Sequence, residues 1–494
     1  MANNRRKKQR AVESSEDYIS ELPDSILCNI LSSLKIREAV KTSVLSSRWR
    51  NICTTPTNLI LDADSILERE EDYSATNICY LSEVLRYLIK KNRSYAFVGN
   101  VNQYLSSVEQ VQKIHMLKVC FTFRHNRYGC TDLDDWIRFV MKRNVEEIDL
   151  CLMEENHQLS APNDGSLYVF PCDIVGNGDA SGFKSFLKCM RLAHCVLAPH
   201  KSYNYGFSTL TTLELLKVDF KSEEHIQILL SCCNNLEWLS LSECYNLDCL
   251  KINPPFCQQL KHLNVNLCHQ LQAIKVQSTN LETLEYNGCK IDLLFDAPRL
   301  KTFFSHVSYS TACHREIWPV FRLPIDLPQL ETLFLECSCS MGEVMTNRLP
   351  IFPNLRHLVV IKVAIIRHEP SWIVTVLNAC PTLQRLELHL RTYFHFDEKL
   401  RKTSWPARSP HNHLKEVSIT GIRGYSSEIE IAIYLLKNAI ALEKMTIDPR
   451  PRIYIGNGKW SHSEACENWS RVGRQKVYNH LMQEVNSTMK LLIL

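Results

Sequence analysis

The sequence lacks several features that mark whole classes of protein. It has no uncharged apolar run of about 18 residues, the length that favours a membrane-spanning helix, and no apolar segment follows its basic start. We therefore expect neither a transmembrane segment nor secretion. Glycine is also scarce, at 14 of 494 residues, so the chain offers few tight turns that could cradle phosphate groups.

The chain also lacks the charge excess that would point to nucleic acid as a main partner. Its net charge is +4, but the run Arg5-Arg6-Lys7-Lys8 together with Arg10 supplies five positive charges and no acid. Without these five, 52 basic side chains stand against 53 acidic ones, a net charge of −1. The basic run is either a nuclear localisation signal or a solvated tail, and we expect a nuclear or cytoplasmic protein.

Known catalytic and metal-binding motifs are missing as well. The sequence contains no G-x-S-x-G, H-E-x-x-H, P-loop or G-x-G-x-x-G, and no two of its 21 cysteines are spaced as C-x-x-C. In a reducing compartment we expect most cysteines to be small buried hydrophobic residues, and nothing marks one as a nucleophile. The sequence therefore predicts no catalytic residue, no metal site and no cofactor.

A compact helical segment near the N-terminus carries more apolar side chains than it can bury alone. From Asp24 onward, apolar residues recur one and four positions apart, which predicts a helix with one apolar face, and Pro23 suits its first turn. A second short helix is predicted over 36–45, and a third after Ser46 and Ser47. Such a small unit rarely forms a complete core, so the rest of the chain or a partner should cover part of this surface.

This segment resembles the F-box, and its ending "LSSRWRNI" resembles the plant version of that motif. The resemblance rests on Leu22-Pro23, on the apolar pairs of the first helix, and on Arg48-Trp49-Arg50. A plain helical cap of the following domain would show the same periodicity, but not Leu-Pro and Arg-Trp-Arg at these places. The resemblance implies docking to a Skp-type adaptor, and through it to a cullin and a RING subunit.

The resemblance also implies which residues contact the adaptor. We expect these contacts from Leu22, Pro23, Ile26, Ile30, Leu31, Val44, Leu45 and Trp49. Trp49 is the best single candidate for an energetically dominant contact, of about 2 kcal/mol or more. A core position within the F-box is the alternative for this tryptophan, and the two roles are compatible.

The pattern L-x-x-L-x-L recurs along most of the remaining chain. Clear copies start at Leu210, Leu236, Leu260, Leu281, Leu330, Leu355 and Leu383, and weaker copies at Val145, Leu187, Leu300, Leu414 and Leu442. Most steps between starts fall at or near the roughly 20 to 29 residues of a leucine-rich repeat. Each unit offers one short strand whose leucines point inward while the residue between them points outward, and stacking of units forms the core.

Helices are predicted in several of the segments that return from one strand to the next. Their amphipathic patterns cover residues 131–143, 222–233, 371–379 and 428–439. A loop with a short inserted strand, "SLYVF", follows the first weak repeat, and another insertion precedes Leu330.

The two motifs in this order resemble plant F-box proteins with leucine-rich repeats, and residues 414–447 resemble the FBD region that closes many of them. The expected fold is α/β: a leucine-rich-repeat solenoid, with short parallel strands on the concave face and helices or loops on the convex side, preceded by a small three-helix F-box. The expected segments are a disordered basic tail (1–17), the F-box (18–56), a linker with a first helical or repeat segment (57–130), the repeats (131–410), FBD-like repeats (411–450) and a C-terminal tail with a helix (451–494).

The resemblance implies the substrate-recognition subunit of a Skp-cullin-F-box ubiquitin ligase, which is not itself an enzyme. The repeats would bind an unknown target protein, with no nucleic acid or membrane as partner. The alternative is a repeat scaffold outside any ligase. On the target side, three consecutive outward strand positions, Phe304, Phe334 and Val359, are apolar and suggest a contact patch, unless the insertion before Leu330 covers them.

Overall fold

The computed structural model of the protein divides into two compact units, Met1–Val145 and Glu146–Leu494. The described residues are 19, 21–32, 34, 38, 41–42, 44–49, 57–67, 83–109, 111–121, 127–152, 167–176, 185–200, 206–289, 291–307, 327–337, 351–362, 372–390, 410–464, 469–485 and 489–494. The basic run, half of the predicted second helix and most of the insertion before Leu330 therefore lie outside the described residues.

The first unit contains the N-terminal helical segment and a pair of parallel strands. Its elements are α1 (Asp24–Ser32), β1 (Asn58–Asp62), α4 (Ala63–Ile66), α6 (Glu83–Ser107), β2 (Met116–Cys120) and α7 (Arg127–Met141). Strands β1 and β2 pair in parallel, and alternate residues of each are buried. Asn102 joins the two long helices, because it accepts a hydrogen bond from Trp136 at 2.7 Å and donates one to Asp132 at 2.8 Å.

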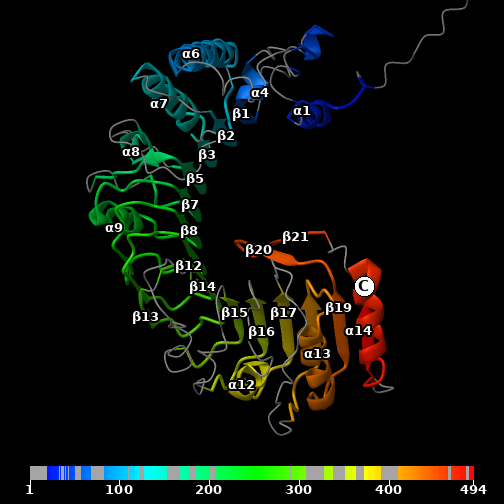
Figure 1. The fold of residues 1–494 in the computed structure, drawn as a ribbon. Helices are drawn as coiled ribbons and strands as arrows, with labels where there is room; N and C mark the ends of the chain where they lie inside the picture. Colours follow the sequence, from blue (N-terminus) through cyan, green and yellow to red (C-terminus); the bar gives the residue numbers. More distant parts are fainter. Residues whose placement is uncertain are drawn as a thin grey trace, which may run out of the picture. The chain divides into compact units, whose positions relative to one another are not determined.

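The second unit is a solenoid whose parallel strands follow one another in chain order (Figure 1). The strands of this sheet are β3 (Glu147–Cys151), β5 (Cys189–Ala193), β7 (Thr212–Leu216), β8 (Trp238–Ser242), β10 (His262–Asn266), β12 (Thr283–Gly288), β14 (Thr302–Val307), β15 (Thr332–Cys337), β16 (His357–Lys362), β17 (Arg385–Leu390), β18 (Glu416–Thr420), β19 (Lys444–Asp448) and β22 (Lys490–Ile493).

The leucine pattern explains why these strands stack in register. In β7, Leu213 and Leu215 are buried while Glu214 between them is half-buried on the other face. Leu213 lies beside Leu239 of β8, and the same alignment continues from strand to strand. Each repeat therefore completes the core of the next, as expected for a quasi-one-dimensional array. The predicted leucine-rich-repeat solenoid is confirmed.

The segments that return between strands contain helices and two small sheets. The helices are α8 (Cys172–Gly176), α9 (Glu223–Cys232), α12 (Trp372–Ala379) and α13 (Ser426–Asn438). The predicted helices over 131–143, 222–233, 371–379 and 428–439 are confirmed within a few residues by α7, α9, α12 and α13. The small sheets were not predicted, apart from β4: they join β9 (Cys249–Ile252), β11 (Ala273–Gln277) and β13 (Asp292–Asp296), and β4 (Tyr168–Val169) with β6 (Cys195–Val196).

The C-terminal segment is more ordered than the predicted tail with a helix. It contains an antiparallel hairpin of β20 (Arg452–Gly456) and β21 (Lys459–His462), a π-helical turn (Trp469–Gly473) and helix α14 (Arg474–Leu481). Strand β22 then pairs in parallel with β19. The last strand of the solenoid therefore comes from the very end of the chain.

Candidate functional site

The F-box segment presents an apolar surface to solvent. Helix α1 exposes Ile26 and Ile30 at 45% and 39%, and Val44 and Leu45 on the following segment are 81% and 65% exposed. Pro23 is exposed as well, and Leu34, an apolar residue that is not among the predicted adaptor contacts, is 37% exposed. Side chains of this type on one small module form a surface that a partner can bury.

Two of the predicted adaptor-binding residues are instead core residues of the F-box. Leu31 and Trp49 are only 8% and 6% exposed, and they pack with Leu27, which is fully buried. Leu22 is half-buried against the same cluster. In this structure the F-box core therefore covers most of the surface of both side chains. The core alternative for Trp49 is the one that the structure shows.

An ion pair holds the third helical turn against the start of α1. The Arg48 guanidinium donates to the Asp24 carboxylate at 2.6 and 2.8 Å, and to the Leu22 carbonyl at 2.5 Å. Both charged side chains are largely exposed, so this contact fixes geometry more than it stabilises the fold. Arg48 and Trp49 together therefore close the small core around Leu27 and Leu31, and they leave Ile26 and Ile30 of α1 on the outside.

The second candidate surface is the outward face of the solenoid strands. Phe304, Phe334 and Val359 lie side by side at equivalent positions of β14, β15 and β16, as predicted. Phe304 and Val359 are nevertheless buried, at 5% and 1% exposure, and Phe334 is half-buried. The premise that this patch is open to water does not hold in this structure.

The cover comes from the β20–β21 hairpin. Tyr454 and Trp460 pack against Phe304, Phe334 and the buried side chains beside them. The ring centroids of Tyr454 and Phe304 are 4.2 Å apart, and those of Trp460 and Phe334 are 6.4 Å apart. Figure 1 shows β20 and β21 lying across this face of the sheet. The hairpin therefore covers the patch, and residues 308–326 of the insertion lie outside the described residues.

Polar contacts fix the two ends of the hairpin to the same sheet face. At the tip, the Asn457 backbone N–H donates to Glu285 at 2.9 Å, and the Asn264 side chain donates to the Asn457 side chain at 2.6 Å. At the other end, the Arg452 guanidinium donates to Glu387 at 3.3 Å and lies over the Trp460 ring, 4.7 Å from its centroid. Two carboxylates thus flank an apolar floor.

The two carboxylates differ in their electrostatic surroundings. Burial raises the pKa of Glu285, although hydrogen bonds from Tyr454 and from the hairpin backbone oppose the shift. Burial acts in the same direction on Glu387, but hydrogen bonds from His357 and His389, with the charge of Arg385, outweigh it and hold the pKa of Glu387 well below its usual range. Glu387 is therefore a fixed negative charge at neutral pH.

The neighbouring part of the outward face is polar. Arg191 of β5 contacts Glu147 of β3 and lies 3.4 Å from Glu214 of β7. The rings of Trp238 and His262 stack with centroids 3.6 Å apart, and burial lowers the pKa of His262 to about 4. His262 is consequently neutral at pH 7, and this region does not continue the apolar floor.

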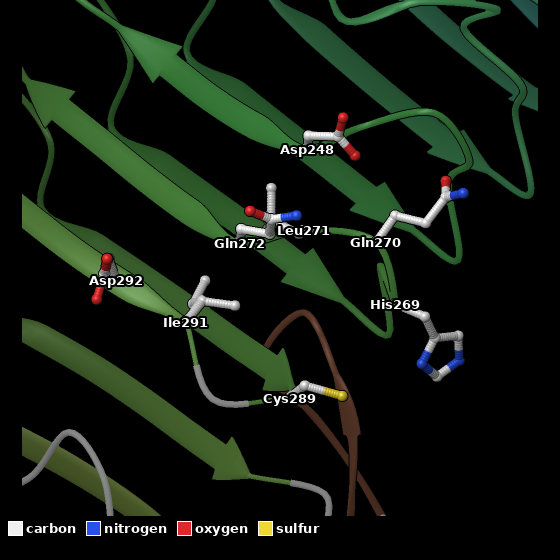
Figure 2. Close-up of a pocket in the computed structure, with 8 residues that line it drawn as sticks. All are labelled: Asp248, His269, Gln270, Leu271, Gln272, Cys289, Ile291 and Asp292. Carbon is white, nitrogen blue, oxygen red and sulfur yellow. The ribbon is translucent and has the colours of Figure 1, made fainter.

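An open pocket of about 600 Å³ is lined by residues at or just before the strands of the small β9–β11–β13 sheet and by residues that follow β10 and β12 (Figure 2). Asp248 and Gln272 directly precede β9 and β11, Asp292 is the first residue of β13, and all three line the pocket. In Figure 2 the side chains of Asp248, His269 and Asp292 point in different directions and do not converge on one position. This arrangement does not assemble a catalytic or ligand-binding group.

The cysteines serve packing between repeats. None of the cysteines whose side chains the structure describes forms a disulfide, and several are buried. The Cys244 and Cys268 thiols donate weakly to carbonyls of the preceding repeat, those of Leu215 and Leu241, at 3.6 and 3.7 Å. Burial raises the pKa of Cys257 to about 12, which suppresses the thiolate form needed by a nucleophile.

No cluster of three or more histidine, cysteine, aspartate or glutamate side chains suited to a metal ion occurs among the described residues. Among the helices that the structure describes, none is both long enough and apolar enough to span a bilayer.

The chain combines a helical module that exposes an apolar face with a solenoid of parallel strands. This combination is typical of adaptor proteins, which act through their binding surfaces. Comparison with known proteins gives the family: residues 19–61 match the model of the F-box domain, and residues 107–494 match that of the At1g61320/AtMIF1, LRR domain. The chain belongs to the F-box proteins with leucine-rich repeats, as the sequence predicted. Neither model is that of an enzyme family.

Relatives in Arabidopsis thaliana carry the same domains in their names. The chain is 31% identical over 230 residues to F-box/FBD/LRR-repeat protein At1g13570, covering 46% of this chain and 44% of that protein. It is 25% identical to putative F-box/LRR-repeat protein At5g54820 over 90% of this chain and 92% of the relative. For FBD-associated F-box protein At5g22730 the identity is 24%, over 88% and 89%. The last two alignments span nearly the whole chain.

Proposed function

We propose that this chain is the substrate-recognition subunit of a Skp-cullin-F-box ubiquitin ligase. The F-box docks on a Skp-type adaptor, which connects it to a cullin and a RING subunit, while the repeats hold a target protein. The observation that carries this proposal is the division of labour in the F-box: Leu27, Leu31 and Trp49 form its core, while Ile26, Ile30, Val44 and Leu45 remain exposed.

The chain would promote ubiquitination by position alone. A target held on the solenoid has its lysines near the charged conjugating enzyme, which raises their effective concentration without a new reactive group. The buried cysteines with raised pKa and the divergent pocket side chains support a role without bond-making chemistry.

The test is copurification with a Skp-type adaptor. Wild type is compared with Ile26→Asp plus Val44→Asp, which place charges on two exposed apolar positions and leave the small core intact. Ser25→Asp is the matched control, because Ser25 is an exposed polar residue of the same helix. We expect a stoichiometric complex with wild type and the control, and its loss with the double variant.

The alternative is a repeat scaffold outside any ligase. It predicts folded wild-type protein that does not take the adaptor, and that result would overturn the proposal. A change at Leu22 is a less informative test than the double variant, because Leu22 packs on the F-box core and its removal also weakens the fold.

A further inference from the structure

The β20–β21 hairpin occupies the sheet face where the sequence predicted target binding. It places Tyr454 and Trp460 on the floor formed by Phe304, Phe334 and Val359, and its tip reaches Glu285. The hairpin belongs to residues outside the repeated pattern, so the stacking of repeats does not require it. Its contacts therefore resemble those between a receptor surface and a bound peptide.

The hairpin depends on this surface for its own order. Two antiparallel strands without a third partner are marginally stable in water at best. Among the strands that the structure describes, β20 and β21 pair only with each other, and their far side exposes Ile455 at 61%. The apolar contacts that stabilise the hairpin are thus those of Tyr454 and Trp460 with the sheet. If these contacts are lost, the segment leaves the sheet and no longer keeps its hairpin structure.

The base of the hairpin is anchored separately from its tip. Asp448 at the end of β19 accepts hydrogen bonds from the Arg450 backbone and guanidinium, at 2.9 to 3.0 Å. The tip is held at Asn457, which contacts Asn264 and Glu285, and at Gly458, whose backbone N–H also donates to Glu285. The segment can therefore leave the sheet face from its tip while its base stays attached to the solenoid.

The covered surface has a defined chemistry. Its floor takes aromatic rings, Glu387 at one end accepts a guanidinium, and Glu285 at the other end accepts backbone and hydroxyl donors. An extended peptide segment with two aromatic residues and an arginine satisfies each of these groups. An acidic segment does not, because Glu387 carries a fixed negative charge in a buried position.

We propose that this face of the solenoid, from β10 to β17, is the target-recognition site, and that the β20–β21 hairpin is its intramolecular occupant. A target binds there through an extended segment with aromatic residues and an arginine, and it displaces the hairpin. This inference rests on the proposed function for its biological meaning, because a substrate receptor is what would use such a site. It adds a closed and an open state to that receptor.

The test uses a fluorescent peptide with the sequence of residues 450–463 of this chain as the probe. Its binding to the full chain is measured by fluorescence anisotropy for wild type and for Tyr454→Ser plus Trp460→Ser, which removes the two rings from the seated hairpin. If the hairpin is seated 90 to 99% of the time, the wild-type affinity is reduced by about 10- to 100-fold relative to an open site. We therefore expect the double variant to bind the probe at least about tenfold more tightly.

Matched controls distinguish binding at this site from nonspecific binding of the probe. Ile455→Ser changes the solvent side of the same hairpin and should bind the probe as weakly as wild type. Adding Phe334→Ser to the open variant should remove the gain in affinity. A probe peptide with serine in place of both aromatic residues keeps the charge and should not bind.

Three results would overturn the inference. One is an open variant, folded by circular dichroism, that binds the probe no more tightly than wild type. Another is hydrogen exchange of the hairpin amides at a rate as slow as that of the β16 amides. Equal rates would mean that the hairpin does not leave the sheet face separately from the core of the solenoid. The third is dimerisation of the wild-type protein, seen by light scattering and lost in the open variant, which would make the hairpin of a second copy the occupant. None of these readouts involves the adaptor, so failure of this inference is distinct from failure of the proposed function.

Discussion

The stability of the C-terminal repeats should depend on pH through Glu428, and the sign of this dependence can be derived from the structure. The Glu428 carboxylate lies under the start of α13, only 1% exposed, and one of its oxygens accepts hydrogen bonds from the backbone of Arg423, Gly424 and Tyr425 at 2.9 to 3.0 Å. Burial raises the pKa of Glu428 to about 7, although these hydrogen bonds and the Arg423 charge oppose the shift.

A carboxyl whose pKa is raised by folding favours the folded state in its protonated form. Well below pH 4.5, the ordinary value, the group is protonated in both states and carries no penalty. As the pH rises from 4.5 through 7, the unfolded chain ionises this carboxyl more readily than the folded protein does, and stability falls. The shift from 4.5 to about 7 corresponds to a loss of about 3 kcal/mol, an order-of-magnitude figure, completed near pH 8.

The perturbation is Glu428→Gln, which keeps an acceptor oxygen of the same shape but cannot ionise. We expect this variant to match wild type within about 1 kcal/mol at pH 5 and to be more stable by about 2 to 3 kcal/mol at pH 8. Urea denaturation followed by tryptophan fluorescence at both pH values measures the difference. Glu428→Ala should be less stable than Glu428→Gln at both, by about 1 to 3 kcal/mol, because the backbone donors lose their acceptor.

The control is Glu416→Gln, which changes an exposed carboxylate of β18 that lies outside this cap. Its effect should be the same at pH 5 and pH 8. A Glu428→Gln variant that becomes less stable relative to wild type as the pH rises would refute the reasoning. It would mean that the backbone donors stabilise the carboxylate more strongly than burial penalises it.

Three further outcomes are expected. Trp49→Ala should destabilise the F-box by about 3 kcal/mol or more, measured by limited proteolysis of residues 1–60, whereas Ile30→Ala should leave its folding nearly unchanged; equal sensitivity would contradict the separation of core and docking face. Gly424→Ala should lower the melting temperature of the chain, because a Cβ there would lie 2.7 Å from a backbone atom of Gly473 at a φ of +88°, while Gly99→Ala in α6 meets open space and should be neutral or stabilising. For localisation, we propose that residues 5–10 direct the protein to the nucleus; a fluorescent fusion in which the basic residues of that run are alanine should shift to the cytoplasm, and unchanged distribution would leave the run a solvated tail.

The repeat architecture could be predicted because its signal is periodic and redundant. A single L-x-x-L-x-L copy is weak evidence, but copies in near register imply a stack whose strands must be parallel and whose leucines must point inward. The small β9–β11–β13 sheet was missed because its strands have no repeated leucine signature of their own: Lys251 and Lys275 stand at outward positions in otherwise short apolar segments. The long helix α6 was predicted only as an unplaced helical or repeat segment within 57–130, since its apolar residues are too dispersed to mark one face.

The F-box residues show where sequence reasoning reaches its limit. Periodicity identifies the apolar positions of α1 but does not say which of two adjacent stripes faces the core. Leu27 and Leu31 lie on one stripe and Ile26 and Ile30 on the next, and the choice depends on where Trp49 packs from a separate helical turn. That contact is tertiary, so the docking surface could be predicted only as a mixture of both stripes.

The hairpin was missed even though its signal is present in the sequence. The stretch "RIYIGNGKW" places Asn-Gly between short apolar strands, which is the strongest local indication of a two-residue hairpin turn. Asn457 and Gly458 indeed both adopt positive φ, at 53° and 70°. Apolar residues on an outward strand face and an aromatic hairpin elsewhere in the chain each lack a partner when considered alone. Considered together they complete one another, so an unexplained apolar patch should be compared with every unassigned aromatic segment of the same chain before an external partner is inferred for it.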